Sequence, residues 1–257
     1  GRYAQSVVLD LGSETSTAAV IEALATLWRR HEVLRAKQLA GAITILPVDA
    51  AAPPDVSQKA AATTEWRAQL AEERQRLALA LSPERGIMLQ ATIFAGEDRL
   101  WLLLCLHHFV CDGVSWRILI EDLDNLLRGR ALDQPSTPFA AYAREMAGSA
   151  SSRRDELPFW HRQLDSAGML LPSASFDRAR DTFGTRQVLR TTLPHEVTRA
   201  LLGPIPHAFG ASIDDILLTA LVVAVRRWRH GQGDSRSKLL LAVEGHGRGH
   251  GSLDLSR

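Results

Sequence analysis

Residues 100–106 form an uninterrupted apolar run, and the segment 107–113, which reads His-His-Phe-Val-Cys-Asp-Gly, follows it directly. A short, fully apolar and β-prone run predicts a buried central strand. After Gly113 the apolar residues recur at helical spacing as far as residue 127, which predicts a helix. The two histidines therefore lie where a buried strand ends, and open α/β proteins often place their chemistry at such strand ends.

The histidine pair allows two interpretations. Adjacent strand residues point to opposite faces, so His107 and His108 cannot serve one site unless the strand has already ended. One imidazole is then expected to face a cleft while the other is packed or hydrogen-bonded. Asp112 could orient an imidazole or hold the loop through an arginine, and Gly113 would allow a tight turn. The alternative is a pair of satisfied strand-end histidines with a capping aspartate.

A second polar segment comes after an apolar run near the end of the chain. Residues 238–243 predict a strand, and residues 244–248, Glu-Gly-His-Gly-Arg, end it. A carboxyl group in an apolar cleft has a raised pKa, which would let Glu244 carry a proton near neutral pH. One alternative is a glycine-rich turn with an exposed acid. Another is a metal site of Glu244, His246 and His250, although the intervening glycines argue against a helix presenting it.

Elsewhere, apolar periodicity and turn residues predict an alternation of strands and helices. Strands are expected at 5–11, 42–48, 86–94, 99–106 and 185–193, and helices at about 17–31, 64–80, 139–147, 156–164, 194–202 and 212–228. The last helix is apolar almost all round and is expected to be buried. The charged residues of the helix at 64–80 are expected to form a solvated face. Residues 50–62 and 131–138 predict loops, and 168–183 predict a linker between two halves.

Bulk properties exclude several classes of function. The net charge is +1 over 257 residues, which argues against a dedicated nucleic-acid surface. No apolar run approaches the ~18 residues needed to cross a bilayer, and the first residues show no signal-peptide pattern. The spacing of Cys105 and Cys111 fits no zinc or disulfide framework, so a reducing cytoplasm is expected. Cys111 is better explained as a small packed residue than as a nucleophile.

Both polar segments resemble signatures of one family. His-His-x-x-x-Asp-Gly at 107–113 resembles that of the condensation-domain superfamily of nonribosomal peptide synthetases, and Val-Ser-Trp-Arg at 114–117 resembles its epimerization branch. Residues 244–248 resemble the second epimerization signature, which condensation domains proper do not usually carry. The stretch 254–257 resembles the family segment just after that signature. The chain departs from the family at Gly249, where an acid is common, and at Ala4, where asparagine is common.

The resemblance implies an α/β, chloramphenicol-acetyltransferase-like fold with two subdomains in a V shape, mixed sheets and flanking helices. Residues 1–175 would form the N-terminal subdomain with the His-His loop, and residues 176–257 would begin the C-terminal one. The family domain is longer than this chain. By this resemblance the chain is expected to lack the family's first helix and everything after Arg257, so the second subdomain is expected to be incomplete. The absent part normally supplies some of the cleft, which argues against activity of this polypeptide by itself.

The resemblance also implies a reaction, namely L-to-D epimerization at the α-carbon of an aminoacyl or peptidyl thioester. The thioester would hang on the 4'-phosphopantetheine of a peptidyl carrier protein domain, beside other synthetase domains or modules, in antibiotic or other secondary metabolism. His108 and Glu244 would transfer the protons, while His107, Asp112 and Gly113 would support the loop. No metal and no directly bound cofactor are expected, and the amino acid is not specified. The alternatives are amide-bond formation by a condensation domain, simple acyl transfer, and a non-catalytic carrier-docking fragment.

Overall fold

The computed structural model describes residues 3–62, 64–134, 136–165, 177–236, 238–245, 247–248 and 253–255. Contacts within the chain define two compact units, residues 1–150 together with 245–257, and residues 151–244. The expected boundary at residue 175 lies outside the described residues and stays a prediction.

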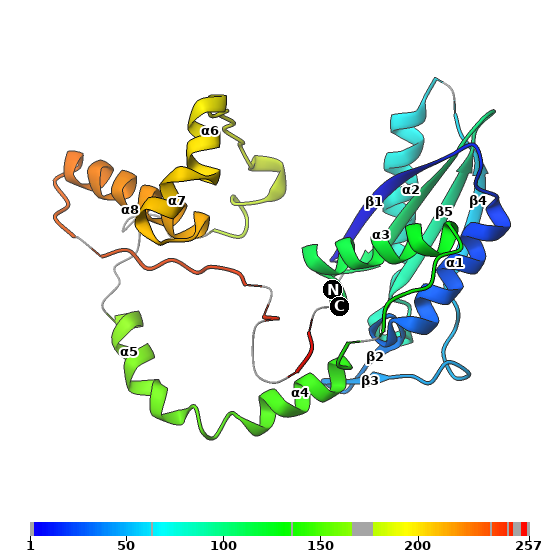
Figure 1. The fold of residues 1–257 in the computed structure, drawn as a ribbon, viewed down its shortest axis with the longest axis horizontal. Helices are drawn as coiled ribbons and strands as arrows, with labels where there is room; N and C mark the ends of the chain where they lie inside the picture. The colour runs from blue at the N-terminus through cyan, green and yellow to red at the C-terminus, as the bar shows by residue number, and fades with distance from the viewer. Residues whose placement is uncertain are drawn as a thin grey trace. The chain divides into compact units, whose positions relative to one another are not determined.

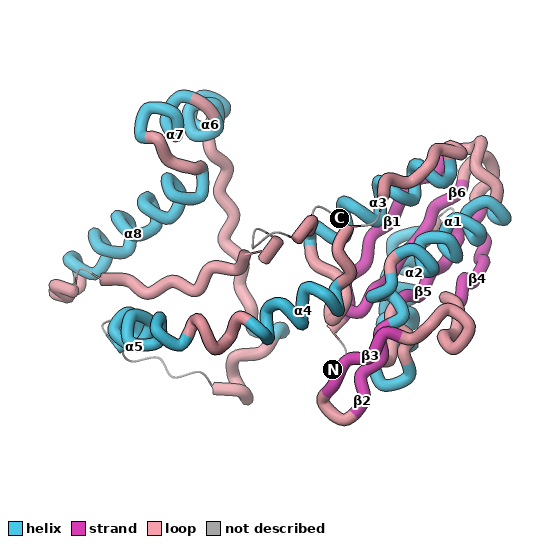
Figure 2. Tube along the Cα trace, turned by 60° about the horizontal axis from the view of Figure 1, so that its bottom comes forward, coloured by secondary structure: helices cyan, strands magenta, loops and turns pink. Residues whose placement is uncertain are grey.

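The first unit is built on a four-stranded mixed sheet in the order β1-β6-β5-β4 (Figures 1 and 2). Its strands are β1 (Ala4–Gly12), β4 (Asp55–Ala60), β5 (Leu89–Ala95) and β6 (Leu100–His107). The β6 strand pairs antiparallel with both β1 and β5, while β4 pairs parallel with β5. Because β6 has a neighbour on each side and is buried from Leu102 to His107, the predicted central strand is confirmed.

Helices cover both faces of this sheet (Figure 1). On one face α1 (Thr17–Arg30) and α3 (Gly113–Leu127) pack against Leu102, Leu104 and Leu106. On the other, α2 (Trp66–Ala80) packs against Leu103 and Cys105. The alternation of β6 side chains between the two helical layers follows from the period of two in a strand. A continuous apolar run is therefore what a sheet covered on both faces requires.

Shorter elements complete this unit. A hairpin joins β2 (Ala36–Leu39) to β3 (Ala42–Ile45), and α4 (Phe139–Gly148) follows the loop after α3. Two 3-10 turns, η1 (Glu32–Arg35) and η2 (Pro83–Arg85), connect the larger elements. The predicted start of α1 is confirmed, since the Ser16 side chain accepts the Ala19 backbone N–H at 3.2 Å.

Two expectations for this unit are wrong. Residues 50–62 are not entirely loop, because β4 lies within them as an edge strand of the sheet. Its sequence is polar, so parallel pairing with β5, and not apolar alternation, makes it a strand. The charged residues of α2 are not all solvated either. Glu73 is 1% exposed and is bound by Lys59 and Arg76.

The second unit is helical, with α5 (Leu157–Asp165), α6 (His195–Leu202), α7 (Pro204–Phe209) and α8 (Ile213–Gly231), and with 3-10 turns η3 (Arg154–Glu156) and η4 (Phe183–Thr185). A capping box between Ser212 and Asp215 begins α8, which confirms the helix start expected at residue 212. The expected burial of α8 is wrong, since Leu217 and Trp228 are about half exposed. None of its apolar side chains is fully buried; Arg229 alone among the described residues of this helix is.

The strands expected at 185–193 and 238–243 are also wrong, because the structure has no strand there. A β-strand needs a neighbour for its backbone groups, and the described part of this unit offers none. No single described helix is long and apolar enough to cross a membrane. The helical segments His195–Phe209 and Ile213–Gly231, which are bent by 96° relative to each other, have the length and apolar composition of a membrane span only when they are taken together.

Candidate functional site

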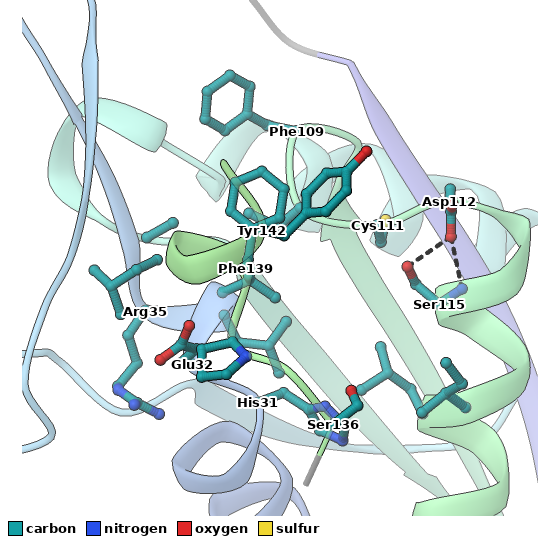
Figure 3. Close-up of a pocket in the computed structure, with 18 of the residues that line it drawn as sticks. His31, Glu32, Arg35, Phe109, Cys111, Asp112, Ser115, Ser136, Phe139 and Tyr142 are labelled. Atoms are coloured by element: carbon teal, nitrogen blue, oxygen red, sulfur yellow. Dashed lines mark hydrogen bonds between the residues drawn. The ribbon is translucent and has the colours of Figure 1, made fainter. Parts of the chain in front are cut away.

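A cavity of about 560 Å³ lies in the first unit, where β6 ends. Its wall comes from the end of α1 with η1, the β2–β3 hairpin, the loop that leads into α3, and the start of α4. Figure 3 shows side chains from these separate segments, among them His31, Asp112 and Tyr142, gathered around it. His108 also lines this cavity, together with Gly247 and Arg248 from the second polar segment.

His108 is held by contacts at both ends of its ring. Its Nδ1 lies 2.6 Å from the carbonyl oxygen of Cys111, and its Nε2 lies 3.5 Å from Nε2 of Gln5. A carbonyl oxygen can only accept, so Nδ1 carries the proton and donates it. In the neutral ring the lone pair is therefore on Nε2, which is the atom able to take up a proton.

His107 is placed differently. It is 6% exposed and does not line the cavity, and its Nδ1 accepts the backbone N–H of Phe109 at 3.2 Å. The strand ends at His107, so the two rings diverge as the alternation of strand side chains predicts. One imidazole lines the cavity and the other is packed and hydrogen-bonded. Their chemical roles stay predictions.

Asp112 is the N-cap of α3. Its Oδ1 accepts the backbone N–H of Ser115 at 2.7 Å and the Ser115 hydroxyl at 2.6 Å (Figure 3). Arg248 donates to the same oxygen at 3.3 Å and to the Ser115 hydroxyl oxygen at 3.1 Å. Burial alone would raise the pKa of Asp112, but the bonds from Ser115 and the charge of Arg248 lower it. Of the two expected arrangements, the structure shows the contact with an arginine.

Gly113 is the first residue of α3. Its φ is not positive, and a Cβ added there would meet nothing within 4 Å. The backbone conformation therefore does not require glycine at this position.

Glu244 belongs to the second unit, where it is exposed and does not follow a strand. The expectation that Glu244 lies buried at a strand end is therefore wrong. Its pairing with His108 across a substrate stays a prediction. His246 and His250, the other members of the alternative metal set, lie outside the described residues. Among the described side chains, no three of His, Cys, Asp and Glu form a metal-binding group.

The end of the second polar segment does reach the cavity. The Tyr142 hydroxyl donates to the Gly247 carbonyl oxygen at 3.4 Å, and Arg248 contacts Asp112. Two segments separated by more than a hundred positions therefore meet in the first unit. The meeting joins Arg248 to the cap of the helix that follows His108.

Cys111 is buried at 5% exposure. Burial, followed by the charge of Asp112, raises the pKa of its thiol to about 12. A thiol that ionises only there is a poor nucleophile, in agreement with a packed structural role.

Sequence reasoning missed two features of this site. His31 is the expected helix-end residue, but its Nε2 also lies 2.8 Å from Oδ2 of the buried Asp122. Gln5 lies beside His108 and accepts the Trp116 indole N–H at 2.8 Å. A polar residue within an apolar strand was the available signal for Gln5, although only the register of β1 shows what it contacts.

Comparison with known proteins gives consistent matches. The family model described as "Condensation domain" matches residues 1–257. A plipastatin synthase subunit of Bacillus subtilis (strain 168) is 31% identical over 99% of this chain and 10% of its own length. A linear gramicidin synthase subunit of Brevibacillus parabrevis is 32% identical over 98% of this chain and 5% of its own length. The chain thus spans a small part of these relatives.

Solved structures share the fold. The epimerization domain from the third module of tyrocidine synthetase B matches with a TM-score of 0.75 and 27% identity, over 89% of this chain and 55% of that one. VibH, an NRPS condensation enzyme, matches with a TM-score of 0.67 and 19% identity, over 87% of this chain and 54% of that one. These likenesses confirm the expected α/β, chloramphenicol-acetyltransferase-like fold class. The V-shaped arrangement of two subdomains stays a prediction.

Proposed function

The chain belongs to the condensation-domain family, and on that premise we propose that it epimerizes the α-carbon of an aminoacyl or peptidyl thioester. The substrate is carried on the 4'-phosphopantetheine arm of a peptidyl carrier domain in a nonribosomal peptide synthetase. Adjacent synthetase domains supply and receive it. The thioester itself makes the α-proton acidic, so the reaction needs proton-transfer groups and no bound metal.

One observation carries this proposal. The Glu-Gly-His-Gly-Arg segment ends at the cavity that His108 lines, with Arg248 bound to Asp112 and Ser115. Amide-bond formation uses the His-His loop but has no need of this second segment. The likeness to the epimerization domain of tyrocidine synthetase B, at 27% identity, adds support.

In the proposed mechanism, Nε2 of His108 takes part as a base, because the Cys111 carbonyl oxygen holds the proton on Nδ1. The Cα–H bond breaks, its electron pair moves onto the thioester oxygen to give an enolate, and the proton goes to a base on one face. A proton returned to the opposite face inverts the centre. Glu244 is the proposed partner on that face, and either group could act first since the reaction is reversible.

Asp112 and His107 are proposed to support the loop. Asp112 fixes the start of α3 through Ser115 and ties it to Arg248. His107 receives the N–H of Phe109 and so helps to define the turn that carries His108. Gly113 is the first residue of the helix after this turn, with open space where a side chain would lie.

The test uses the full-length natural protein in which this chain occurs, together with a loaded carrier domain. We expect wild type to release α-tritium from an L-aminoacyl thioester into solvent. His108→Ala and Glu244→Gln should each lose most of this exchange, while Glu196→Gln, on an exposed surface of α6, should keep it. Wild-type exchange in both site variants would refute the assigned roles.

Condensation is the second candidate, because the matching family model is described as "Condensation domain". There His108 would assist an acceptor amine as it attacks a carrier-bound thioester. Product analysis separates the two reactions, since condensation gives a new peptide and epimerization gives a D-epimer of the same chain length. Carrier binding with neither product would identify a docking module.

A further inference from the structure

The amide of Gln5 has a fixed direction. The indole Nε1–H of Trp116 can only donate, and it lies 2.8 Å from Oε1 of Gln5. The Cys111 thiol also points to this oxygen, at 3.8 Å. Because Trp116 needs an acceptor, the oxygen of the Gln5 amide faces Trp116 and its NH₂ group faces Nε2 of His108.

The register of the β1–β6 pairing places Gln5 beside the His108 ring. On the β1–β6 ladder Gln5 lies opposite Leu106, and the ladder continues one step further, since the His108 N–H donates to the Tyr3 carbonyl oxygen at 2.8 Å. Residues 106 and 108 share a face by the period of two, so Gln5 and His108 are diagonal neighbours on that face. A long side chain such as glutamine can cover this diagonal.

The resulting hydrogen bonds all run in one direction. Trp116 donates to Gln5, the Gln5 amide is directed at Nε2 of His108, and Nδ1–H of His108 donates to the Cys111 carbonyl oxygen. This order fits a neutral imidazole with its proton on Nδ1. In a doubly protonated ring, Nε2–H and the Gln5 NH₂ group would be two donors face to face at 3.5 Å.

We propose that Gln5 is a positioning residue for His108. The Gln5 amide fixes the His108 ring and favours its neutral Nδ1–H form, and Trp116 sets the direction of that amide. The catalytic consequence depends on the proposed role of His108 as a proton-transfer group. The coupling between Gln5 and the ring does not depend on it.

Other groups around the ring are accounted for. The Cys111 thiol has its pKa raised to about 12 by burial and so stays neutral, and Asp112 is paired with Arg248. The Tyr3 ring lies 4.8 Å from the imidazole, centroid to centroid. Among the described residues, titratable or charged side chains near His108 come from β1, the end of β6, the following loop and the second polar segment, and they include Tyr3, His107, Cys111, Asp112 and Arg248.

The variant Gln5→Glu tests the proposal with little change of shape. One carboxylate oxygen can still accept from Trp116, and the other then faces Nε2 as an acceptor with negative charge. The protonated ring becomes the favoured form, and an adjacent opposite charge moves a titration by about 1–3 pH units. Gln5→Met removes both polar contacts while keeping the length of the side chain. Gln75→Glu, on the exposed surface of α2, is the matched control for the added charge.

The experiment follows the ring-nitrogen ¹⁵N signals of His108 by NMR and the pH dependence of α-proton exchange, in the full-length natural protein. We expect wild type to show the Nδ1–H form. In Gln5→Glu the protonated ring should persist to a pH at least about 1 unit higher than in wild type. The acid limb of the exchange profile should move with it. Above the acid limb, Gln5→Met should exchange about tenfold more slowly with unchanged KM, as loss of one hydrogen bond predicts.

A merely structural Gln5 would leave the ring signals and the acid limb of Gln5→Glu identical to those of Gln75→Glu, and that result would overturn the proposal. Should Gln5→Glu fail to fold, Trp116→Phe keeps the test open. It removes only the indole donor and frees the amide to turn, so a mixture of ring tautomers is expected, and an unchanged tautomer would contradict the idea. If the ring signals change in Gln5→Glu but the protein shows no α-proton exchange, the epimerization proposal is refuted and the proposal about Gln5 stands.

Discussion

Replacing Glu73 with glutamine should destabilise the first unit by a pH-dependent amount. The carboxylate is 1% exposed beneath the sheet and binds Lys59 at 2.6 Å, Arg76 at 2.6 Å and the Thr92 hydroxyl at 2.5 Å. Burial alone would raise the pKa of Glu73, but hydrogen bonds from Arg76, Lys59 and Thr92, with the charge of Arg76, lower it from 4.5 to about 2. At about 1.4 kcal/mol per pH unit, that displacement is worth about 3 kcal/mol of folding free energy at neutral pH.

The sign of the pH dependence follows from the lowered pKa. A carboxyl with a folded-state pKa of about 2 and an unfolded value of 4.5 stabilises the fold above pH 4.5 and loses this contribution as pH falls towards 2. We expect Glu73→Gln to reduce the free energy of unfolding by about 3 kcal/mol at pH 7 and by only about 1 kcal/mol at pH 3.

Urea unfolding followed by tryptophan fluorescence at several pH values measures this difference, and the Trp66–Trp101 pair, with Trp66 at the start of α2, contributes to the signal. Glu72→Gln, on the exposed side of the same helix, is the control and should change stability by less than about 0.5 kcal/mol. A Glu73→Gln effect that is constant between pH 7 and pH 3, or no larger than that of the control, would refute the reasoning.

Two further changes concern buried groups near the cavity. Asp122→Asn leaves His31 without its 2.8 Å carboxylate partner and should lower the free energy of unfolding by about 1–3 kcal/mol in urea titrations, whereas Asp124→Asn, at the helix surface, should have little effect. The thiol of Cys111 should react with Ellman's reagent only after denaturation, because it is buried and its pKa is raised to about 12. Rapid modification of the native protein at pH 8 would contradict the burial.

The sequence predicts this fold best where local pattern and tertiary packing require the same thing. The run 100–106 is apolar throughout because β6 is covered on both faces, so its burial could be inferred from composition alone. Ser16 and Ser212 begin helices through short-range caps that the sequence displays directly. In contrast, β4 is polar and becomes a strand only through its pairing with β5.

Failures in the second unit have one physical origin. Residues 238–243 and the apolar surface of α8 have the composition of buried elements, but in the described part of that unit residues 238–243 form no strand and no apolar side chain of α8 is fully buried. Apolar periodicity indicates which side chains favour burial and does not identify what would bury them. Glu244 was expected to be buried for the same reason and is exposed.

The candidate site shows the corresponding limit for polar residues. His108 and Asp112 could be selected because their chemistry is visible within seven residues of sequence. Gln5 could not, since its contact with His108 depends on the register of β1 against β6. A slip of one residue would turn Gln5 to the face covered by α2 and leave Trp116 without its acceptor. The orientation of the His108 ring therefore depends on the sheet that α1, α2 and α3 stabilise, so substitutions that loosen that packing should reduce the proposed proton transfer before they unfold the protein.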